Sequence, residues 1–187
     1  LGLFCGLLGL LGGCPNVAKK SARDLNAVTL PPGFHIDVYA ENLPGARSLA
    51  RGLGGTIFVG TRDLGGGSVY ALSDKDGDQK AEIVRTIIAN LESPNGVAVR
   101  DGALFVAEAR RVIRFDDIEN HLDAPPAVVE VRGGFPSGHH GWKYLRFGPD
   151  GLLYIPIGIP CDLCEPAEPR LGTIMRMKPD GSELSIF

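Results

Sequence analysis

The sequence has no block of basic residues and no long stretch with the periodicity of an amphipathic helix. Its 19 basic and 22 acidic residues give a formal net charge of -3, so the composition does not favour nucleic acid as a partner. In the absence of helical periodicity, the 26 glycines and 14 prolines indicate many short strands joined by turns. We therefore expect an all-β fold and no nucleic-acid partner.

The chain also lacks an apolar run of about 20 residues, the length that a membrane-spanning helix requires. Residues 1–13 are almost wholly apolar and end at Cys14, which suits the apolar part of a secretory signal. Residues 11–14, LGGC, resemble a bacterial lipobox, whose cysteine receives a lipid; an ordinary signal peptide with a chance cysteine is the alternative. We expect residues 1–14 to direct export to the periplasm or cell envelope, with membrane contact only through a lipid on Cys14.

Residues 15–30 are polar and aperiodic, as in a linker, and short apolar runs separated by turns begin at Pro31. The sequence starts without methionine and stops inside a strand-like run at Phe187. We therefore expect a fragment of a longer protein, in which residues 31–187 form part of a domain.

Three segments of the chain align with one another. Phe58, Phe105 and Tyr154 hold the same place in them and are 47 and 49 residues apart, and further apolar runs flank each segment. A repeat of this length with several strands is typical of a β-propeller blade, whereas a sandwich spaces strands similarly without repeating a four-strand unit. The sequence predicts a β-propeller with about three four-stranded blades, preceded by an outer strand at residues 34–40 that closes the ring with the last blade.

Strand alternation within a blade predicts which side chains share a face. Turns before the first strand and between the second and third strands open on one side. His139 and His140 precede the first strand of the third blade, Asn95 precedes that of the second, and Arg62 and Glu108 follow second strands. One histidine alone would as readily be a turn residue, but this combination of side chains favours a functional site. Imidazole suits a general base near neutral pH, and arginine suits an anionic carboxylate.

Residues 140–158, HGWKYLRFGPDGLLYIPIG, resemble the pyrroloquinoline-quinone-dependent glucose/sorbosone dehydrogenase family, and residues 158–166, GIPCDLCEP, resemble its sorbosone branch. The likeness extends less sharply over residues 30–187. It implies a six-bladed propeller that binds the quinone over its axis, calcium that polarises the quinone, and a histidine that removes the proton of the substrate hydroxyl. His140, eight residues before Gly148, matches that histidine.

The resemblance implies oxidation of a small sugar, an aldose or a sorbosone-like keto-aldehyde, with electrons passed to an external acceptor. Arg62 and Asn95 are expected to contact the cofactor, mainly because of their predicted face. Ile159 stands where the glucose dehydrogenase branch has an aspartate, and Asp162 is the candidate to replace that carboxylate. Most cofactor ligands of the family lie in later blades, so we expect these residues to be inactive alone.

Residues 74–82, DKDGDQKAE, space four carboxylates as a calcium-binding turn does. The spacing departs from the EF-hand loop because glycine is fourth rather than sixth. The blade model places this turn on the face opposite His140, so a calcium ion there would be structural; a solvated acidic turn without metal is the alternative. The carboxylates are Asp74, Asp76, Asp78 and Glu82.

Cys161 and Cys164 form a CxxC pair that Glu165 follows, and the missing histidine disfavours covalent haem. A CxxC pair alone is a weak signal for a zinc site, and no second pair of cysteines lies close to it in the sequence. In an exported protein we expect a disulfide beside the site; a redox-active pair is the alternative. Two other functions remain open for the whole chain: a calcium-dependent six-bladed propeller lactonase and a non-enzymatic propeller scaffold.

Overall fold

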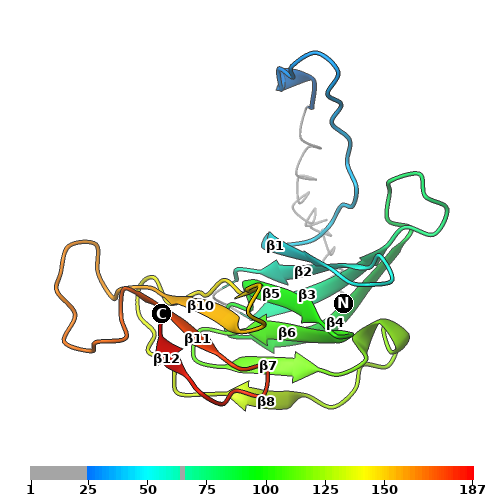
Figure 1. The fold of residues 1–187 in the computed structure, drawn as a ribbon. Helices are drawn as coiled ribbons and strands as arrows, with labels where there is room; N and C mark the ends of the chain where they lie inside the picture. The colour runs from blue at the N-terminus through cyan, green and yellow to red at the C-terminus, as the bar shows by residue number, and fades with distance from the viewer. Residues whose placement is uncertain (1–24, 64–65) are drawn as a thin grey trace, which may run out of the picture. The chain divides into compact units, whose positions relative to one another are not determined.

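The computed structural model describes residues 25–63 and 66–187 (Figure 1). Contacts divide the chain after Asp37, and Val38–Phe187 form one compact unit. The described part of the first unit contains the 3-10 turn η1, Leu25–Ala27. The predicted signal segment, its lipobox Cys14 and residues 15–24 of the predicted linker lie outside the described residues.

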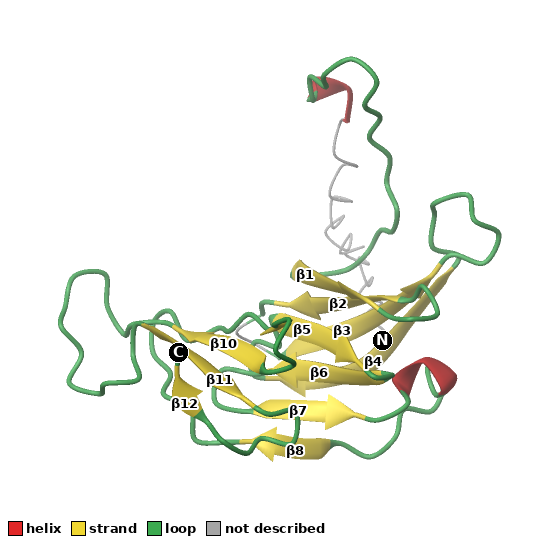
Figure 2. Cartoon of the chain, in the orientation of Figure 1, coloured by secondary structure: helices red, strands yellow, loops and turns green. Residues whose placement is uncertain are grey.

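The described chain is all-β, with strands grouped into three four-stranded antiparallel sheets and no α-helix (Figure 2). In each sheet the strands lie in chain order. The first sheet contains β1 (Ala46–Arg51), β2 (Ile57–Thr61), β3 (Gly67–Ser73) and β4 (Ile83–Leu91). The second contains β5 (Gly96–Arg100), β6 (Ala103–Ala107), β7 (Val112–Phe115) and β8 (Val129–Arg132), with the 3-10 turn η2 (Ile118–Asn120) after β7. The third contains β9 (Arg146–Phe147), β10 (Leu153–Ile157), β11 (Thr173–Met177) and β12 (Ser185–Ile186).

These sheets are three blades of a partial β-propeller, which confirms the predicted fold. Each sheet uses four consecutive strands, as a blade does and a sandwich does not. The predicted sequence repeat is also confirmed, because its equivalent residues occupy equivalent positions in the three sheets. Phe58, Phe105 and Tyr154 all lie in the second strand of their sheet, where they pair with Ala71, Arg114 and Arg176 of the third strand. No helix in residues 25–63 or 66–187 is long and apolar enough to cross a membrane.

Strand β6 of the middle blade is buried on both faces of its sheet, and its side chains alternate between them. Leu104 and Val106 of β6 pack with Phe58 and other side chains of the first blade. Phe105 and Ala107 of the same strand pack into a second cluster with side chains of the third blade. Every residue of β6 is consequently buried, as its almost continuously apolar sequence suggests.

The outer strand predicted at residues 34–40 does not form. This segment is irregular, and none of the described sheets includes it. A strand exists only through hydrogen bonds to a neighbouring strand, and apolar alternation alone does not supply that neighbour. The first strand of the third blade, β9, is only two residues long, Arg146–Phe147.

Candidate functional site

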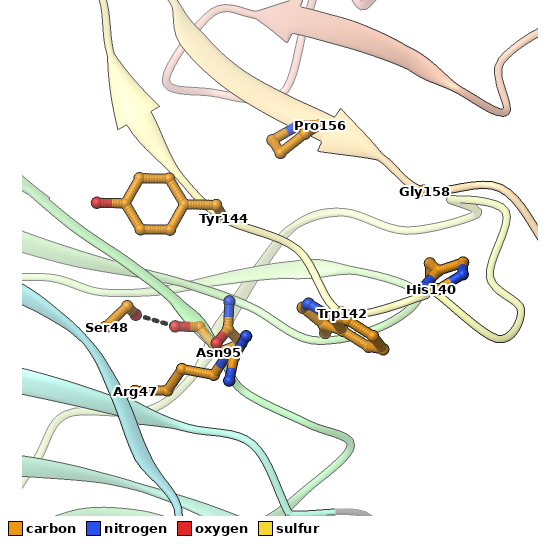
Figure 3. Close-up of a pocket in the computed structure, with 8 residues that line it drawn as sticks. All are labelled: Arg47, Ser48, Asn95, His140, Trp142, Tyr144, Pro156 and Gly158. Atoms are coloured by element: carbon orange, nitrogen blue, oxygen red, sulfur yellow. Dashed lines mark hydrogen bonds between the residues drawn. The ribbon is translucent and has the colours of Figure 1, made fainter. Parts of the chain in front are cut away.

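A cavity of ≈ 580 Å³ lies where turns from the three blades meet (Figure 3). Two of its residues, Asn95 and His140, are predicted site residues, so the structure brings these two together. Both precede the first strand of their blade, as the alternation of strands requires. The remaining lining residues are Arg47, Ser48, Trp142, Tyr144, Pro156 and Gly158.

His140 is half-buried, and its Nε2 lies 2.9 Å from Oδ1 of Asp162. The two residues belong to different turns, before β9 and after β10. The turns touch, because the main-chain nitrogen of His140 donates to the oxygen of Ile159 at 3.4 Å. A side chain at Gly158 would collide with the main chain of His140, so this close approach requires glycine. Asp162, the predicted replacement for the missing aspartate, therefore lies beside His140.

Asn95 presents an unpaired hydrogen-bond acceptor at this cavity. The residue is 4 % exposed, and its Nδ2 donates to the main-chain oxygen of Lys143 at 2.7 Å. Because that oxygen can only accept, the contact fixes which way round the amide lies. Its Oδ1 is buried and has no hydrogen-bond partner among the described residues. A buried polar atom without a partner is rare, and at a cavity it indicates a ligand that donates a hydrogen bond.

The sequence interpretation missed Lys143, which is completely buried. Its Nζ donates to the main-chain oxygens of Pro136 and Gly141, at 3.2 and 3.1 Å. Burial and, to a lesser extent, the charge of Arg110 lower the pKa of Lys143 to about 8, although Glu92 opposes the shift. The buried ammonium thus fastens the turn that carries His140. A lysine followed by Tyr144 and Leu145, shortly before a strand, is a weak sequence signal for such a role.

Arg62 does not line the cavity. Its guanidinium carbon lies 3.5 Å from the centre of the Trp142 ring, a cation–π contact with a side chain that does line the cavity. The cation that does line the cavity is Arg47, which the sequence interpretation did not select. Arg47 is exposed, so its charge is accessible to an anion.

Glu108 shares the predicted side of the blades but not the cavity. Its Oε1 accepts the main-chain N–H of Glu92 at 2.9 Å, and its Oε2 pairs with Nε of Arg111. The hydrogen bond that Arg111 donates to Glu108 also raises the pKa of Arg111. These contacts use the buried carboxylate to hold neighbouring turns together.

The four predicted metal-binding carboxylates gather in the turn between β3 and β4, where their ligand atoms lie within 4.8 Å of one another. Asp74 accepts main-chain N–H groups of Gly77 at 2.7 Å and Gln79 at 3.0 Å, and Glu82 accepts that of Lys75 at 2.7 Å. This all-oxygen set fits a hard cation such as Ca²⁺. The turn extends from the end of the sheets opposite the β10–β11 loop (Figure 1). Cys161 and Cys164, in the β10–β11 loop, are joined by a disulfide.

No family model and no curated protein matches this chain. Solved structures match its fold. An enzyme of carbohydrate-active family AA12 from Trichoderma reesei gives a TM-score of 0.65 at 17 % identity, over 79 % of this chain and 38 % of its own. A pyrroloquinoline-quinone-bound aldose sugar dehydrogenase from Streptomyces coelicolor gives 0.57 at 23 % identity, over 78 % of this chain and 48 % of its own.

A protein from Thermus thermophilus assigned as an oxidoreductase (glucose dehydrogenase) gives a TM-score of 0.54 at 21 % identity, over 74 % of this chain and 45 % of its own. The chain therefore spans less than half the length of each of these three proteins. At these identities the likeness establishes a shared fold.

Proposed function

We propose that the chain is part of an exported propeller oxidoreductase that oxidises an aldose or a sorbosone-like keto-aldehyde, with pyrroloquinoline quinone as hydride acceptor. The observation that carries the proposal is the shared cavity of His140 and Asn95, a paired imidazole beside a buried, unpaired acceptor. The quinone-bound sugar dehydrogenase among the similar folds supports the choice of cofactor.

His140 acts as the general base in this proposal. Its Nε2 donates to Asp162, which leaves Nδ1 as the acceptor of the neutral ring. Nδ1 takes the proton of the substrate hydroxyl, and the Asp162 carboxylate stabilises the imidazolium that results. Pyrroloquinoline quinone, when bound, supplies the acceptor for the hydride that leaves the same carbon.

Two further residues of the cavity bind and orient the ligands. Oδ1 of Asn95 accepts a hydrogen bond from a donor, which suits a sugar hydroxyl or a cofactor N–H and excludes a cofactor carboxylate. Arg47 provides the positive charge for an anionic group of the cofactor. Arg62, selected from the sequence for that task, contributes through its stacking on Trp142.

Calcium binds in the turn that contains Asp74, Asp76, Asp78 and Glu82 and has a structural role there. The remaining cofactor ligands, calcium at the quinone included, belong to blades beyond these residues, so this chain alone is inactive. We also propose that Cys14 carries a lipid and that an external acceptor receives the electrons.

The test is quinone-dependent dye reduction by the full-length protein with aldose and keto-aldehyde substrates. His140→Gln should lower kcat at least 100-fold, within the usual contribution of a general base of about 10²–10⁴. His139→Gln is the matched control and should retain activity, because its ring is not paired with Asp162. Unchanged dye reduction in His140→Gln contradicts the assignment of the base.

The calcium-dependent lactonase is the alternative enzyme. Such a site needs carboxylates around the ion, and none of the residues that line the cavity in the described chain is acidic. Lactone hydrolysis without added quinone would favour this alternative, whereas sugar-dependent bleaching of quinone absorbance would exclude it. A non-enzymatic scaffold would neither hydrolyse lactones nor bleach the quinone absorbance.

A further inference from the structure

Three side chains of types that bind metals lie together where His140 lines the cavity, apart from the acidic turn between β3 and β4. The ligand atoms of His139, His140 and Asp162 all lie within 4.8 Å of one another. They come from two turns, one before β9 and one after β10. Chain folding thus assembles two imidazoles and a carboxylate that the sequence separates by 22 residues.

The spacing of these atoms fits a first-row divalent ion. Zinc binds imidazole nitrogen and carboxylate oxygen at about 2.0–2.2 Å, so the edges of its coordination tetrahedron are about 3.4 Å long. The present separation of Nε2 of His140 from Oδ1 of Asp162 is 2.9 Å. To bind the ion, this pair has to open by roughly 0.5 Å, and His139, whose ligand atom lies within 4.8 Å of the other two, has to complete the set. The fourth position is then left to water or a ligand.

The ligand set selects against the hard cations. Two imidazoles favour Zn²⁺ or Cu²⁺, whereas Ca²⁺ and Mg²⁺ take oxygen ligands. The turn of Asp74 and Glu82 offers oxygen alone. The chain therefore has two clusters with opposite metal preferences. Variants of one cluster serve as controls in binding experiments on the other.

Both ligand-bearing turns are held in place before any ion arrives. The ammonium of Lys143 fastens one turn through the oxygens of Pro136 and Gly141. A Cβ at Gly138 would lie 2.9 Å from the Cα of Pro160, so the two turns are in direct contact. The Cys161–Cys164 disulfide brackets Asp162 in the second turn. Less ordering is therefore left for the ion to impose.

We propose that His139, His140 and Asp162 form a binding site for a divalent transition-metal ion, Zn²⁺ or Cu²⁺. The site goes beyond the proposed sugar oxidation, because metal binding requires neither quinone nor substrate. It also has a consequence for that reaction. An imidazole that binds the ion through one nitrogen carries its proton on the other, so metal-bound His140 has no nitrogen left to accept a proton.

The test is isothermal titration of the full chain, in its oxidised form, with Zn²⁺. One ion should bind, and His139→Gln and Asp162→Asn should each raise the Kd at least about tenfold, since even outer-shell partners of a metal are worth 10–100-fold. His121→Gln is the matched control, an exposed histidine paired with Asp117 instead. The double variant Asp74→Asn, Asp76→Asn should leave zinc binding unchanged.

A second readout uses Trp142, the single tryptophan of the chain. Its ring centre lies 5.6 Å from that of His140, so Cu²⁺ at this site should quench its fluorescence. His139→Gln should need at least tenfold more Cu²⁺ for the same quenching. His121→Gln should titrate as the unaltered protein does.

Three results would overturn the site: no binding at millimolar Zn²⁺, the same Kd in His139→Gln, or binding only after the disulfide is reduced, which indicates the cysteine thiolates. None of these bears on the proposed oxidoreductase, and absence of sugar oxidation leaves the binding experiments valid. If both proposals hold, Zn²⁺ inhibits dye reduction by the unaltered protein, and His139→Gln shifts inhibition to at least tenfold higher zinc.

Discussion

The side-chain amide of Asn95 donates a hydrogen bond to the main-chain oxygen of Lys143, 2.7 Å away and 48 residues further along the chain. The bond fastens the turn before β5 to the turn before β9. The main-chain oxygen of Asn95 in turn accepts from Oγ of Ser48 in β1. Asn95 therefore joins all three blades at the cavity while its own Oδ1 remains available to a ligand.

Asn95→Ala should lower the free energy of unfolding by about 1–3 kcal/mol, because the variant leaves the buried oxygen of Lys143 without its donor. Urea denaturation measures the change. Asn120→Ala is the control, since the Asn120 amide bonds only to nearby Asp117 at the surface. If both variants lose the same free energy of unfolding, the hydrogen bond between blades stabilises the protein no more than a surface hydrogen bond does.

Lys143 should make stability depend on pH in the alkaline range. Its pKa is about 8 in the folded protein and 10.5 as a free side chain, so the unfolded chain binds more protons between these values. Stability from this group therefore rises with pH across that window, by roughly 3 kcal/mol, and is constant below it. The rise should be absent in Lys143→Met and present in Lys80→Met, an exposed control.

Denaturant melts at a series of pH values, taken as differences between each variant and the unaltered protein, measure this effect. The differences cancel the titration of all other groups. Parallel curves for the unaltered protein and Lys143→Met would mean that the buried ammonium is not destabilised by its surroundings.

Glu119 should hold the first two blades together on the side away from the cavity. Its carboxylate accepts the main-chain N–H groups of Gly54, at 3.0 and 3.1 Å, and of Thr56 at 3.3 Å. Glu119→Ala should cost about 1 kcal/mol of unfolding free energy, the size of a net hydrogen bond. Glu165→Ala removes an exposed carboxylate and should cost nothing measurable by the same denaturation. An unchanged free energy of unfolding in Glu119→Ala would contradict the role of this carboxylate in joining the two blades.

Arg62→Ala should expose the Trp142 ring, against which the guanidinium packs at 3.5 Å. We expect the tryptophan emission to shift to longer wavelength and stability to fall by about 0.5–1 kcal/mol. Trp142 is the single tryptophan, so the spectrum reports this ring alone. Arg132→Ala, an exposed arginine of β8, should leave the spectrum unchanged. An unaltered spectrum in Arg62→Ala would argue against the stacking.

Calcium should raise the melting temperature through the turn between β3 and β4. Ligand at 100 times its Kd stabilises a folded protein by about 2.7 kcal/mol. The stabilisation should vanish in the double variant Asp74→Asn, Asp78→Asn and persist in His139→Gln, the reverse of the zinc result. If calcium acts equally on both variants, the acidic turn is only solvated.

Much of the fold could be predicted because its determinants are local. The recurrence of Phe58, Phe105 and Tyr154 reports the blade repeat, and strand alternation then assigns His140 and Asn95 to one side. The strand predicted at residues 34–40 failed for the opposite reason, because pairing depends on a neighbour that no local pattern provides.

The sequence by itself determined the number of blades, the order of strands and the turns that carry the site. Only the tertiary structure decided that Arg47 rather than Arg62 lines the cavity, that Glu108 pairs with Arg111, and that Lys143 is buried. Strand periodicity is set by covalent geometry and is visible in a short stretch of residues. Burial and pairing depend on side chains from other blades, which are about 50 residues away in the sequence. The repeat pattern does not show which of these side chains come into contact.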